Sequence, residues 1–123
     1  MKQFLLVFLG GGLGSILRFI ISKILNTTYI NFYLGTFLVN VFGCLFIGIL
    51  FGLSYKGNYL TQNQTLLLST GFCGGFTTFS TFAFENYSLL KNGDLLYFSI
   101  YTISSILIGV FFISIGLWFS KFI

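Results

Sequence analysis

The sequence predicts an all-helical integral membrane protein with four transmembrane helices, the third of which is broken near its middle. Hydrophobic residues make up 56% of the 123 residues, and only six Lys or Arg and two Asp or Glu are present. That charge content is far too low for an ordinary soluble domain. Four apolar runs follow one another, and each exceeds the ~20 residues that cross a bilayer core as a helix. They cover residues 4–25, 32–53, roughly 65–90 and 95–119.

The pattern of apolar runs predicts a single domain over residues 1–123. The connections between the runs are short and contain neither proline clusters nor low-complexity tracts. Lys2 followed by an apolar stretch is similar to a signal peptide, but no small-x-small cleavage site follows and the apolar run continues past Arg18. We therefore expect this segment to be the first transmembrane helix.

The charged and sulfur-containing residues exclude several classes of function. The formal net charge is +4, but the basic residues are scattered singly, so no patch predicts nucleic-acid binding. Cys44 and Cys73 lie in apolar runs of a chain without histidine, which indicates reduced packing residues rather than ligands of a soft metal. Without histidine and with two acids, the sequence offers no convincing nucleophile, base or metal constellation, so we expect no enzyme.

Basic residues are divided almost evenly between the two sides of the predicted bundle. Four spans place both termini and the second connection on one side. That side carries Lys2, Lys56 and Lys121, and the other carries Lys23 and Lys91, with Arg18 approaching it from within the first helix. The orientation of a membrane protein follows the excess of Lys and Arg in its short loops. The sequence therefore gives only a weak preference for one orientation. Either a weak preference suffices, or the chain has dual topology, with copies inserted each way.

Glycines and one arginine stand out in the first two helices. Gly10 and Gly14, like Gly48 and Gly52, follow the small-xxx-small spacing that lets transmembrane helices approach closely. Arg18 lies well inside the first span, where a charge is costly unless it reaches an interface or water. Two interpretations stay open: the side chain snorkels to the membrane surface, or it forms a positive vestibule that gathers anions.

The second helix carries GTFLVNVFG, in which Thr36, Asn40 and Gly43 share one helical face. Asn40 places an amide, with two donors and one acceptor, near the middle of the span. It is either an interhelical hydrogen-bonding residue, as is common for asparagine in membranes, or a donor that lines a path for an anion.

A polar stripe runs along the last apolar helix. Tyr97, Tyr101, Ser105 and Gly109 recur every fourth residue and so line one face. A serine that bonds back to its own helix would explain Ser105 without a functional role. The stripe is compatible with a polar path along this helix.

The third apolar run is interrupted at GFCGGFTTFSTF, residues 71–82. Two adjacent glycines and a series of hydroxyl residues place a break at residues 74–78, between half-helices at residues 63–73 and 79–90. Backbone that leaves the helix at membrane depth is tolerated only where protein buries it or where it lines a cavity. The break therefore predicts a functional site, with carbonyls and helix ends available to ions. Phe79 and Phe82 lie three apart on one face just after it, a spacing that normally indicates core packing.

Three motifs give the chain a resemblance to a known family. GGGLGSILRF, GTFLVNVFG and GFCGGFTTFSTF, in this order across four short spans, resemble the Fluc (CrcB) fluoride channels over essentially the whole chain. The resemblance implies a passive, fluoride-selective channel that exports cytoplasmic fluoride and lowers its toxicity. It also implies two subunits packed antiparallel with dual topology, two pores and a central structural Na⁺ at the dimer interface.

The resemblance also implies a set of site residues. The fluoride pore would be lined by Asn40, Phe79, Phe82, Ser80, Thr81, Tyr101 and Ser105. Arg18 matches the basic residue of the pore vestibule, and the backbone carbonyls of Gly74 and Thr77 match the Na⁺ ligands. The sequence departs from the family pattern at Ser15 and Phe19, where relatives often have alanine and tyrosine, and at Gly109, where some relatives have serine.

Rival functions differ in the residues they need. A proton-coupled exporter of the small multidrug type needs a titratable carboxylate in the membrane, and Glu85 is the sole candidate. A purely structural protein would leave the broken third helix and the polar groups facing it unexplained.

We therefore expect fluoride and membrane lipid as partners, self-association into a homodimer, and no nucleic acid. The expected location is the cell membrane, the inner or plasma membrane of a bacterium, in a multi-pass arrangement.

Overall fold

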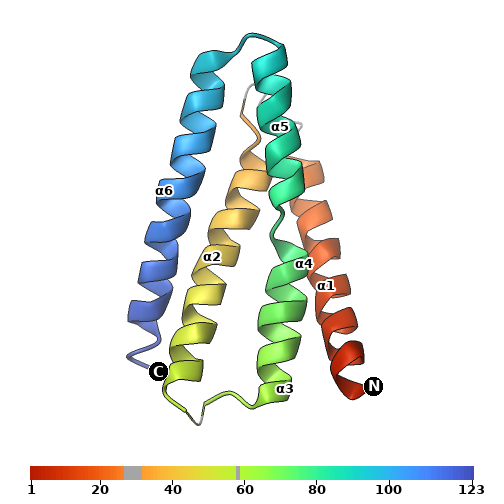
Figure 1. Ribbon diagram of the computed structural model, residues 1–123, viewed down its shortest axis with the longest axis vertical. Coiled ribbons are helices and arrows are strands. Elements are labelled where there is room, and N and C mark those ends of the chain that lie inside the picture. Colours follow the sequence, from red (N-terminus) through yellow and green to blue (C-terminus); the bar gives the residue numbers. More distant parts are fainter. Residues whose placement is uncertain (27–31, 58) are drawn as a thin grey trace.

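The computed structural model describes residues 1–26, 32–57 and 59–123, and every regular element within these ranges is helical. The elements are, in chain order, α1 (Lys2–Leu25), α2 (Leu34–Tyr55), α3 (Gln62–Thr65), the π-helix η1 (Leu66–Cys73), α4 (Gly74–Phe76), α5 (Phe79–Lys91) and α6 (Leu95–Phe119). Figure 1 shows four columns of helix: α1, α2, the interrupted column from α3 to α5, and α6. The prediction of an all-helical chain with a broken third span is confirmed for the described residues.

Three of the four columns have the length and composition of transmembrane helices. Mean hydropathy reaches 2.1 in α1, 2.3 in α2 and 2.2 in α6. Large apolar side chains on these helices point outward: Phe8 is 75% exposed and Leu107 is 64% exposed. In a bilayer such faces meet lipid tails, so the chain is a multi-pass membrane protein. The third column has no helix of this length, because the break divides it into short elements.

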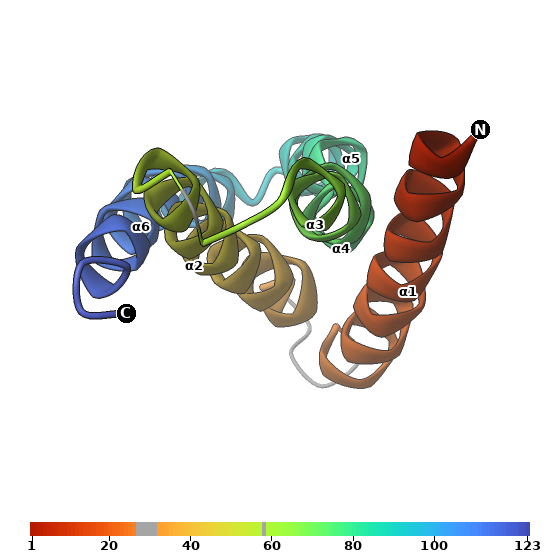
Figure 2. The same cartoon turned by 90° about the horizontal axis from the view of Figure 1, so that it is seen from below.

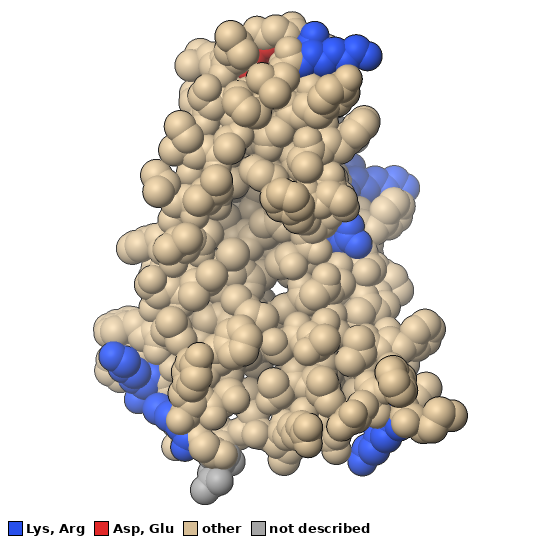
Figure 3. Space-filling model, viewed as in Figure 1, with Lys and Arg blue, Asp and Glu red and all other residues tan. Residues whose placement is uncertain are grey.

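The two ends of the bundle agree with the predicted arrangement. Both termini and the α2–α3 connection lie at one end, and the α5–α6 connection lies at the other (Figure 1). Basic side chains occur toward both ends of the face seen in Figure 3. Both ends of the bundle therefore carry basic side chains, as the sequence predicted.

Glycines let the columns pack backbone against backbone, in the order α6, α2, the α3–α5 column and α1 (Figure 2). A Cβ on Gly14 would meet the carbonyl oxygen of Phe72, and one on Gly48 would meet that of Ile113. Neither position has space for a methyl group. The close packing predicted from the small-xxx-small spacing is confirmed, with α1 against η1 and α4, and α2 against α6.

The break is shorter than the sequence predicted and occupies only the last two of the five residues 74–78. Gly74 and Gly75 are still helical, in α4, and the backbone becomes extended only at Thr77 and Thr78. Threonine favours extended backbone, and its hydroxyl can satisfy a helix end. The paired glycines therefore do not break the helix. Gly75 instead packs on Gly11 of α1, whose Cα would lie 2.8 Å from an added Cβ.

A π-helix of eight residues, η1, precedes the break, and the apolar pattern did not predict it. In a π-helix each amide bonds the carbonyl five residues earlier, so the turn is wider than in an α-helix. Such segments are rare and occur frequently at functional sites. The third column is thus irregular in two successive places, η1 and the extended pair at residues 77–78.

Candidate functional site

Two threonines end one helical segment and start the next. The hydroxyl of Thr77 donates to the Cys73 carbonyl at 2.9 Å, at the end of the first segment. The hydroxyl oxygen of Thr78 accepts the amide of Thr81 at 3.3 Å and so caps the N-terminus of α5. The Cys73 carbonyl also keeps its helical partner, the Thr77 amide at 3.0 Å. The Thr78 hydroxyl satisfies an amide in the first turn of α5, where no partner exists within the helix.

Asn40 of α2 fixes the extended segment from the side. Its Oδ1 accepts the Thr78 amide at 2.8 Å, and its Nδ2 donates to the Thr78 carbonyl at 3.1 Å. Asn40 therefore pairs with both backbone polar groups of one residue, as a neighbouring β-strand would. An asparagine amide has two N–H donors, and Thr78 takes one of them, which leaves capacity for one further acceptor.

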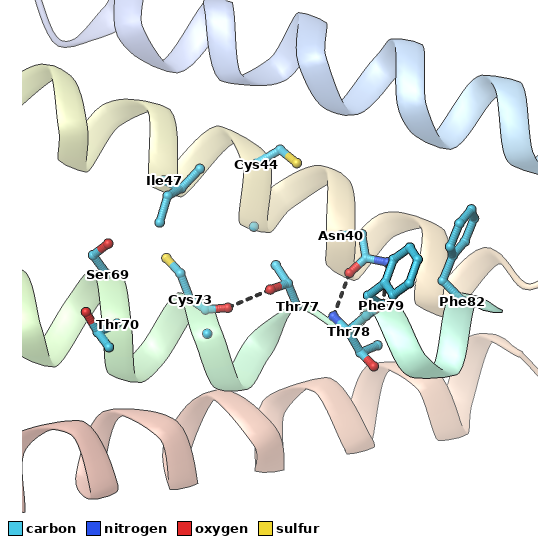
Figure 4. Close-up of a pocket in the computed structure, with 12 residues that line it drawn as sticks. Asn40, Cys44, Ile47, Ser69, Thr70, Cys73, Thr77, Thr78, Phe79 and Phe82 are labelled. Carbon is cyan, nitrogen blue, oxygen red and sulfur yellow. Dashed lines mark hydrogen bonds between the residues drawn. The ribbon is translucent and has the colours of Figure 1, made fainter. Parts of the chain in front are cut away.

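A cavity of about 400 Å³ lies between α2 and the broken column (Figure 4). Five residues that the sequence predicted for the site line it: Asn40, Gly74, Thr77, Phe79 and Phe82. The other lining residues are Gly43, Cys44, Ile47, Ser69, Thr70, Cys73 and Thr78. Cys44 and Cys73 are both free thiols, as expected. The cavity brings the helix break and the aromatic pair to one place.

Aromatic rings extend from this cavity into the interior of the bundle. The ring centroids of Phe79 and Phe82 are 6.1 Å apart, and the ring of Phe82 lies 5.2 Å from that of Tyr101. Phe79 is 79% exposed, whereas Tyr101 is fully buried. The shared face predicted for the two phenylalanines is confirmed. Core packing of this chain does not account for Phe79, because most of its side chain lies at the surface.

Behind the aromatic pair, three side chains donate hydrogen bonds to the carboxylate of Glu85. Thr36 Oγ1 donates to Oε1 and Tyr101 Oη donates to Oε2, each at 2.6 Å. Asn26 Nδ2 also donates to Oε1, at 3.3 Å. Glu85 is 4% exposed, so these donors replace water around a buried acid. Two weak signals for this cluster are present in the sequence: Thr36 lies one turn before Asn40, and Glu85 is an acid within an apolar run.

The other predicted pore residues do not line the cavity within the described part of the chain. They lie close to it, and each has a different environment. Thr81 belongs to the cap of α5, where its hydroxyl accepts from Thr78 at 3.0 Å. Ser80 is exposed, with its hydroxyl oxygen 3.4 Å from that of Thr78. Ser105 of α6 has a buried hydroxyl with no hydrogen-bond partner among the described residues. The interpretation that Ser105 bonds back to its own helix is therefore wrong.

Arg18 reaches the break from α1. Its Nε donates to the Gly75 carbonyl at 3.0 Å, and Ser15 Oγ donates to the same oxygen at 3.3 Å. Neither interpretation of Arg18 drawn from the sequence included this contact. It anchors the guanidinium to the break and leaves its four other N–H donors for water or an anion.

The break also changes the bonding of backbone carbonyls. In a continued helix the Thr78 amide would donate to the Gly74 carbonyl, but it donates to Asn40. Gly74 and Thr77 both line the cavity. Carbonyl oxygens suit hard cations, and unwound carbonyls of broken transmembrane helices coordinate Na⁺ in transporters. The groups at these two positions therefore fit the ion that the sequence predicted.

The whole helix bundle matches a known family. The family model described as CrcB-like protein, Camphor Resistance (CrcB), matches residues 5–117, which include the break and all four columns. The chain belongs to the CrcB family. Because the match covers nearly the whole chain, the CrcB assignment applies to the cavity and the Glu85 cluster as well as to the helices around them.

Three CrcB relatives of similar length share one functional description, fluoride-specific ion channel FluC. The relative from Azobacteroides pseudotrichonymphae genomovar. CFP2 is 43% identical over 99% of this chain and 98% of its own length. That from Phocaeicola vulgatus is 43% identical over 98% of this chain and 100% of its own length. That from Gloeothece citriformis is 46% identical over 98% of both chains.

Proposed function

We propose that this chain forms a fluoride-selective passive ion channel, through which cytoplasmic fluoride leaves the cell down its electrochemical gradient. One observation carries the proposal: Asn40, Phe79 and Phe82 meet at a cavity beside the helix break. They do so in a CrcB chain whose relatives, matched end to end, are described as fluoride-specific channels. The function is transport rather than catalysis, and it lowers fluoride toxicity.

The groups at the cavity and next to it suit a small and strongly hydrated anion. Fluoride leaves water only where other donors replace its hydration shell. The Asn40 amide, the hydroxyls of Ser80 and Thr81, and the positive ring edges of Phe79 and Phe82 are such donors. Each is uncharged, so the ion is held weakly enough to leave again. An inside-negative potential drives the anion outward by ~2.3 kcal/mol per 100 mV, so no coupled energy source is needed.

Three further residues complete the proposed route. Tyr101 and Ser105 extend the polar path along α6, and the buried Ser105 hydroxyl has an unused donor. A buried hydroxyl without a partner is costly, and a passing anion would supply an acceptor. Arg18 is the proposed vestibule residue, since Gly75 occupies its Nε and its terminal N–H groups can attract fluoride.

The proposed channel is an antiparallel homodimer. The cavity at the break is open on this chain, and Phe79 beside it is 79% exposed. Polar backbone at membrane depth must have protein or water against it, not lipid. A second copy would cover the break and create two equivalent pores about a twofold axis. Antiparallel packing requires insertion in both orientations, which the near-even division of basic residues permits.

A structural Na⁺ at the dimer interface completes the proposal. The carbonyls of Gly74 and Thr77 from each subunit would hold it, and the bound ion would balance the partial negative charge of these oxygens. Asn40 contributes indirectly, because it binds the Thr78 amide that would otherwise donate to Gly74. The chemistry of the ligands is that of a hard cation.

The proton-coupled exporter has less support. Its acid, Glu85, is 4% exposed and accepts hydrogen bonds from Thr36, Tyr101 and Asn26. Among the described residues, Glu85 does not line the 400 Å³ cavity that a larger substrate would need. The CrcB relatives are described as channels.

Halide efflux from liposomes that hold the purified protein tests the function. We expect rapid fluoride loss when a K⁺ ionophore carries the balancing charge, and retention of chloride. Equal fluoride and chloride rates would contradict selectivity. Efflux that requires a proton gradient would instead support the exporter.

Cysteine labelling tests dual topology. Gln62→Cys and Asn92→Cys place single thiols at exposed positions at opposite ends of the bundle, in a background without Cys44 and Cys73. Each variant should react with an impermeant reagent from both sides of the membrane. Labelling of each variant from one side only would refute the antiparallel arrangement.

A further inference from the structure

The first turn of α2 is capped by a residue of another helix. Asn26 is the C-cap residue of α1, yet its Oδ1 accepts the amides of Gly35 at 2.7 Å and Thr36 at 3.3 Å. These residues belong to the first turn of α2, where amides have no partner within the helix. The N-cap residue of α2, Tyr33, makes no side-chain cap bond. Asn26 therefore caps α2 from outside it.

The other half of the same amide binds the buried acid. Asn26 Nδ2 donates to Glu85 Oε1 at 3.3 Å and to Thr36 Oγ1 at 3.1 Å. The Thr36 hydroxyl in turn donates to the same carboxylate oxygen at 2.6 Å. One side chain thus joins the end of α1, the start of α2 and the middle of α5.

The position of the Asn26 amide is defined by close packing. A Cβ on Gly35 would lie 2.7 Å from Asn26 Oδ1 and 2.8 Å from the Cα of Ser22. Thr36 is fully buried and Glu85 nearly so. Glycine at position 35 lets α1 lie directly on the first turn of α2, so the contacts of Asn26 are built by the fold of the chain.

A short series of contacts leads from Asn26 to the aromatic pair. Glu85 Oε2 accepts from Tyr101 Oη at 2.6 Å, and the Tyr101 ring lies 5.2 Å from that of Phe82. Phe82 lines the cavity at the break. Because Tyr101 is fully buried, the bond at its hydroxyl helps to decide where its ring lies.

We propose that Asn26 is a positioning residue of the channel. Asn26 holds Glu85 and the start of α2 in one hydrogen-bond network. The network fixes the position of the Tyr101 ring and, through contact with that ring, the position of Phe82. The inference rests on the proposed function and adds a residue from the end of α1, a region that none of the three sequence motifs reaches. A role restricted to capping α2 is the alternative, and it needs only the acceptor half of the amide.

Two substitutions separate the two halves of the amide. Asn26→Ala removes both, whereas Asn26→Asp keeps an oxygen for the α2 amides and replaces the donor to Glu85 with an acceptor. Asn92 provides matched controls, because it is the exposed C-cap residue of α5. Fluoride efflux from liposomes and amide hydrogen exchange at Gly35 and Thr36 are measured for the wild type, both Asn26 variants, Asn92→Ala and Asn92→Asp.

We expect exchange at Gly35 and Thr36 to stay slow in Asn26→Asp and to rise about tenfold or more in Asn26→Ala. Fluoride efflux falls about tenfold in both variants, while the Asn92 controls stay within about twofold of the wild type. Wild-type efflux from a folded Asn26→Asp dimer would overturn the positioning role, since capping alone would then explain the residue.

A double-mutant cycle with Glu85→Gln gives a second test if Asn26→Asp does not fold. If Asn26 acts through Glu85, Asn26→Ala reduces efflux much less in the Glu85→Gln background than in the wild type. Equal fold reductions in the two backgrounds would overturn the inference while leaving the channel function intact. A wild-type protein that releases no fluoride would instead overturn the proposed function, and the positioning role with it.

Discussion

Asn40 and Thr78 pair as two residues of neighbouring β-strands would, although both belong to a helical protein. Oδ1 of Asn40 accepts the Thr78 amide at 2.8 Å, and Nδ2 donates to the Thr78 carbonyl at 3.1 Å. One side chain thus replaces backbone partners that the broken column lost. Because Asn40 also lines the cavity, the shape of the break and the proposed binding of fluoride depend on the same amide.

Replacing Asn40 by aspartate affects both roles, and each effect is measured separately. Asn40→Asp keeps an acceptor for the Thr78 amide but loses the donor to its carbonyl, which costs ~1–3 kcal/mol of unfolding free energy. An ionised carboxylate at the cavity also repels an anion, so fluoride efflux should fall by about tenfold or more. Liposome efflux and thermal unfolding in detergent measure the two effects. The control is Asn63→Asp at an exposed position of α3, and equal efflux from both variants would remove Asn40 from the ion path.

The aromatic pair is tested by removing ring edges at similar volume. Phe79→Ile and Phe82→Ile should each lower stability by less than ~1.5 kcal/mol. Fluoride efflux should nevertheless fall sharply, because isoleucine has no positive edge to face an anion. Phe4→Ile is a matched control, since Phe4 and Phe79 are both 79% exposed. Normal efflux from well-folded Phe79→Ile and Phe82→Ile dimers would show that the rings only fill space.

The close packing of α1 on α4 predicts that alanine substitutions at Gly75 and Gly12 have different effects on stability. A Cβ on Gly75 would meet the backbone of Gly11, so Gly75→Ala should cost ~1–3 kcal/mol as α1 is displaced. A Cβ on Gly12 meets open space, so Gly12→Ala should be neutral or stabilising by up to ~1 kcal/mol. Thermal unfolding in detergent compares them. Equal stabilities would show that α1 and α4 tolerate a wider separation than their close packing indicates.

The cap of α5 can be removed without altering the cavity wall greatly. Thr78→Ala deletes the hydroxyl that accepts the Thr81 amide and should destabilise the protein by ~0.5–2 kcal/mol, whereas Thr78→Ser keeps it. Amide hydrogen exchange should therefore rise over the first turn of α5 in the alanine variant only. Similar exchange in both variants would mean that another group caps this helix.

Removing Na⁺ tests the proposed ion at the interface. An ion that binds the dimer but not the separate subunits stabilises the dimer. Once the sites are largely filled, this stabilisation grows with the logarithm of the ion concentration. Exchange of Na⁺ for a large organic cation should lower the thermal stability of the dimer and its fluoride efflux. A dimer equally stable in both solutions would contradict a Na⁺ site at Gly74 and Thr77.

The sequence predicted where the third span is irregular but not why. Paired glycines within an apolar run indicate a break, yet the same glycines also serve close helix packing, and the sequence alone does not distinguish the two uses. Gly75 packs on Gly11 of α1, far away in the chain, whereas an added Cβ on Gly74 would meet nothing within 4 Å. The extended residues are Thr77 and Thr78, whose hydroxyls satisfy the helix ends. The π-helix η1 escaped prediction because a uniformly apolar segment has no periodicity that separates it from an α-helix.

The family motifs predicted which residues form most of the site. Only the structure shows how these residues are arranged. The family resemblance implied that Asn40, Phe79 and Phe82 belong to the site, and all three line one cavity. The network around Glu85 was not predicted, because its donors come from three other parts of the chain and leave no periodic signal. Asn26 had no motif at all, and its role depends on α1 ending beside the first turn of α2.

The end of α4 and the extended pair that follows it are held from two sides by other helices of the same chain. Arg18 and Ser15 bind the Gly75 carbonyl from α1, and Asn40 binds Thr78 from α2. The surface offered to a second copy therefore has its shape before the copy arrives. Association of preformed surfaces loses less conformational entropy than association that must first order a loop. If the proposed dimer forms, each subunit would keep its folded surface when the pair separates, so lipids that shift the pairing equilibrium would change the number of complete channels without unfolding any chain.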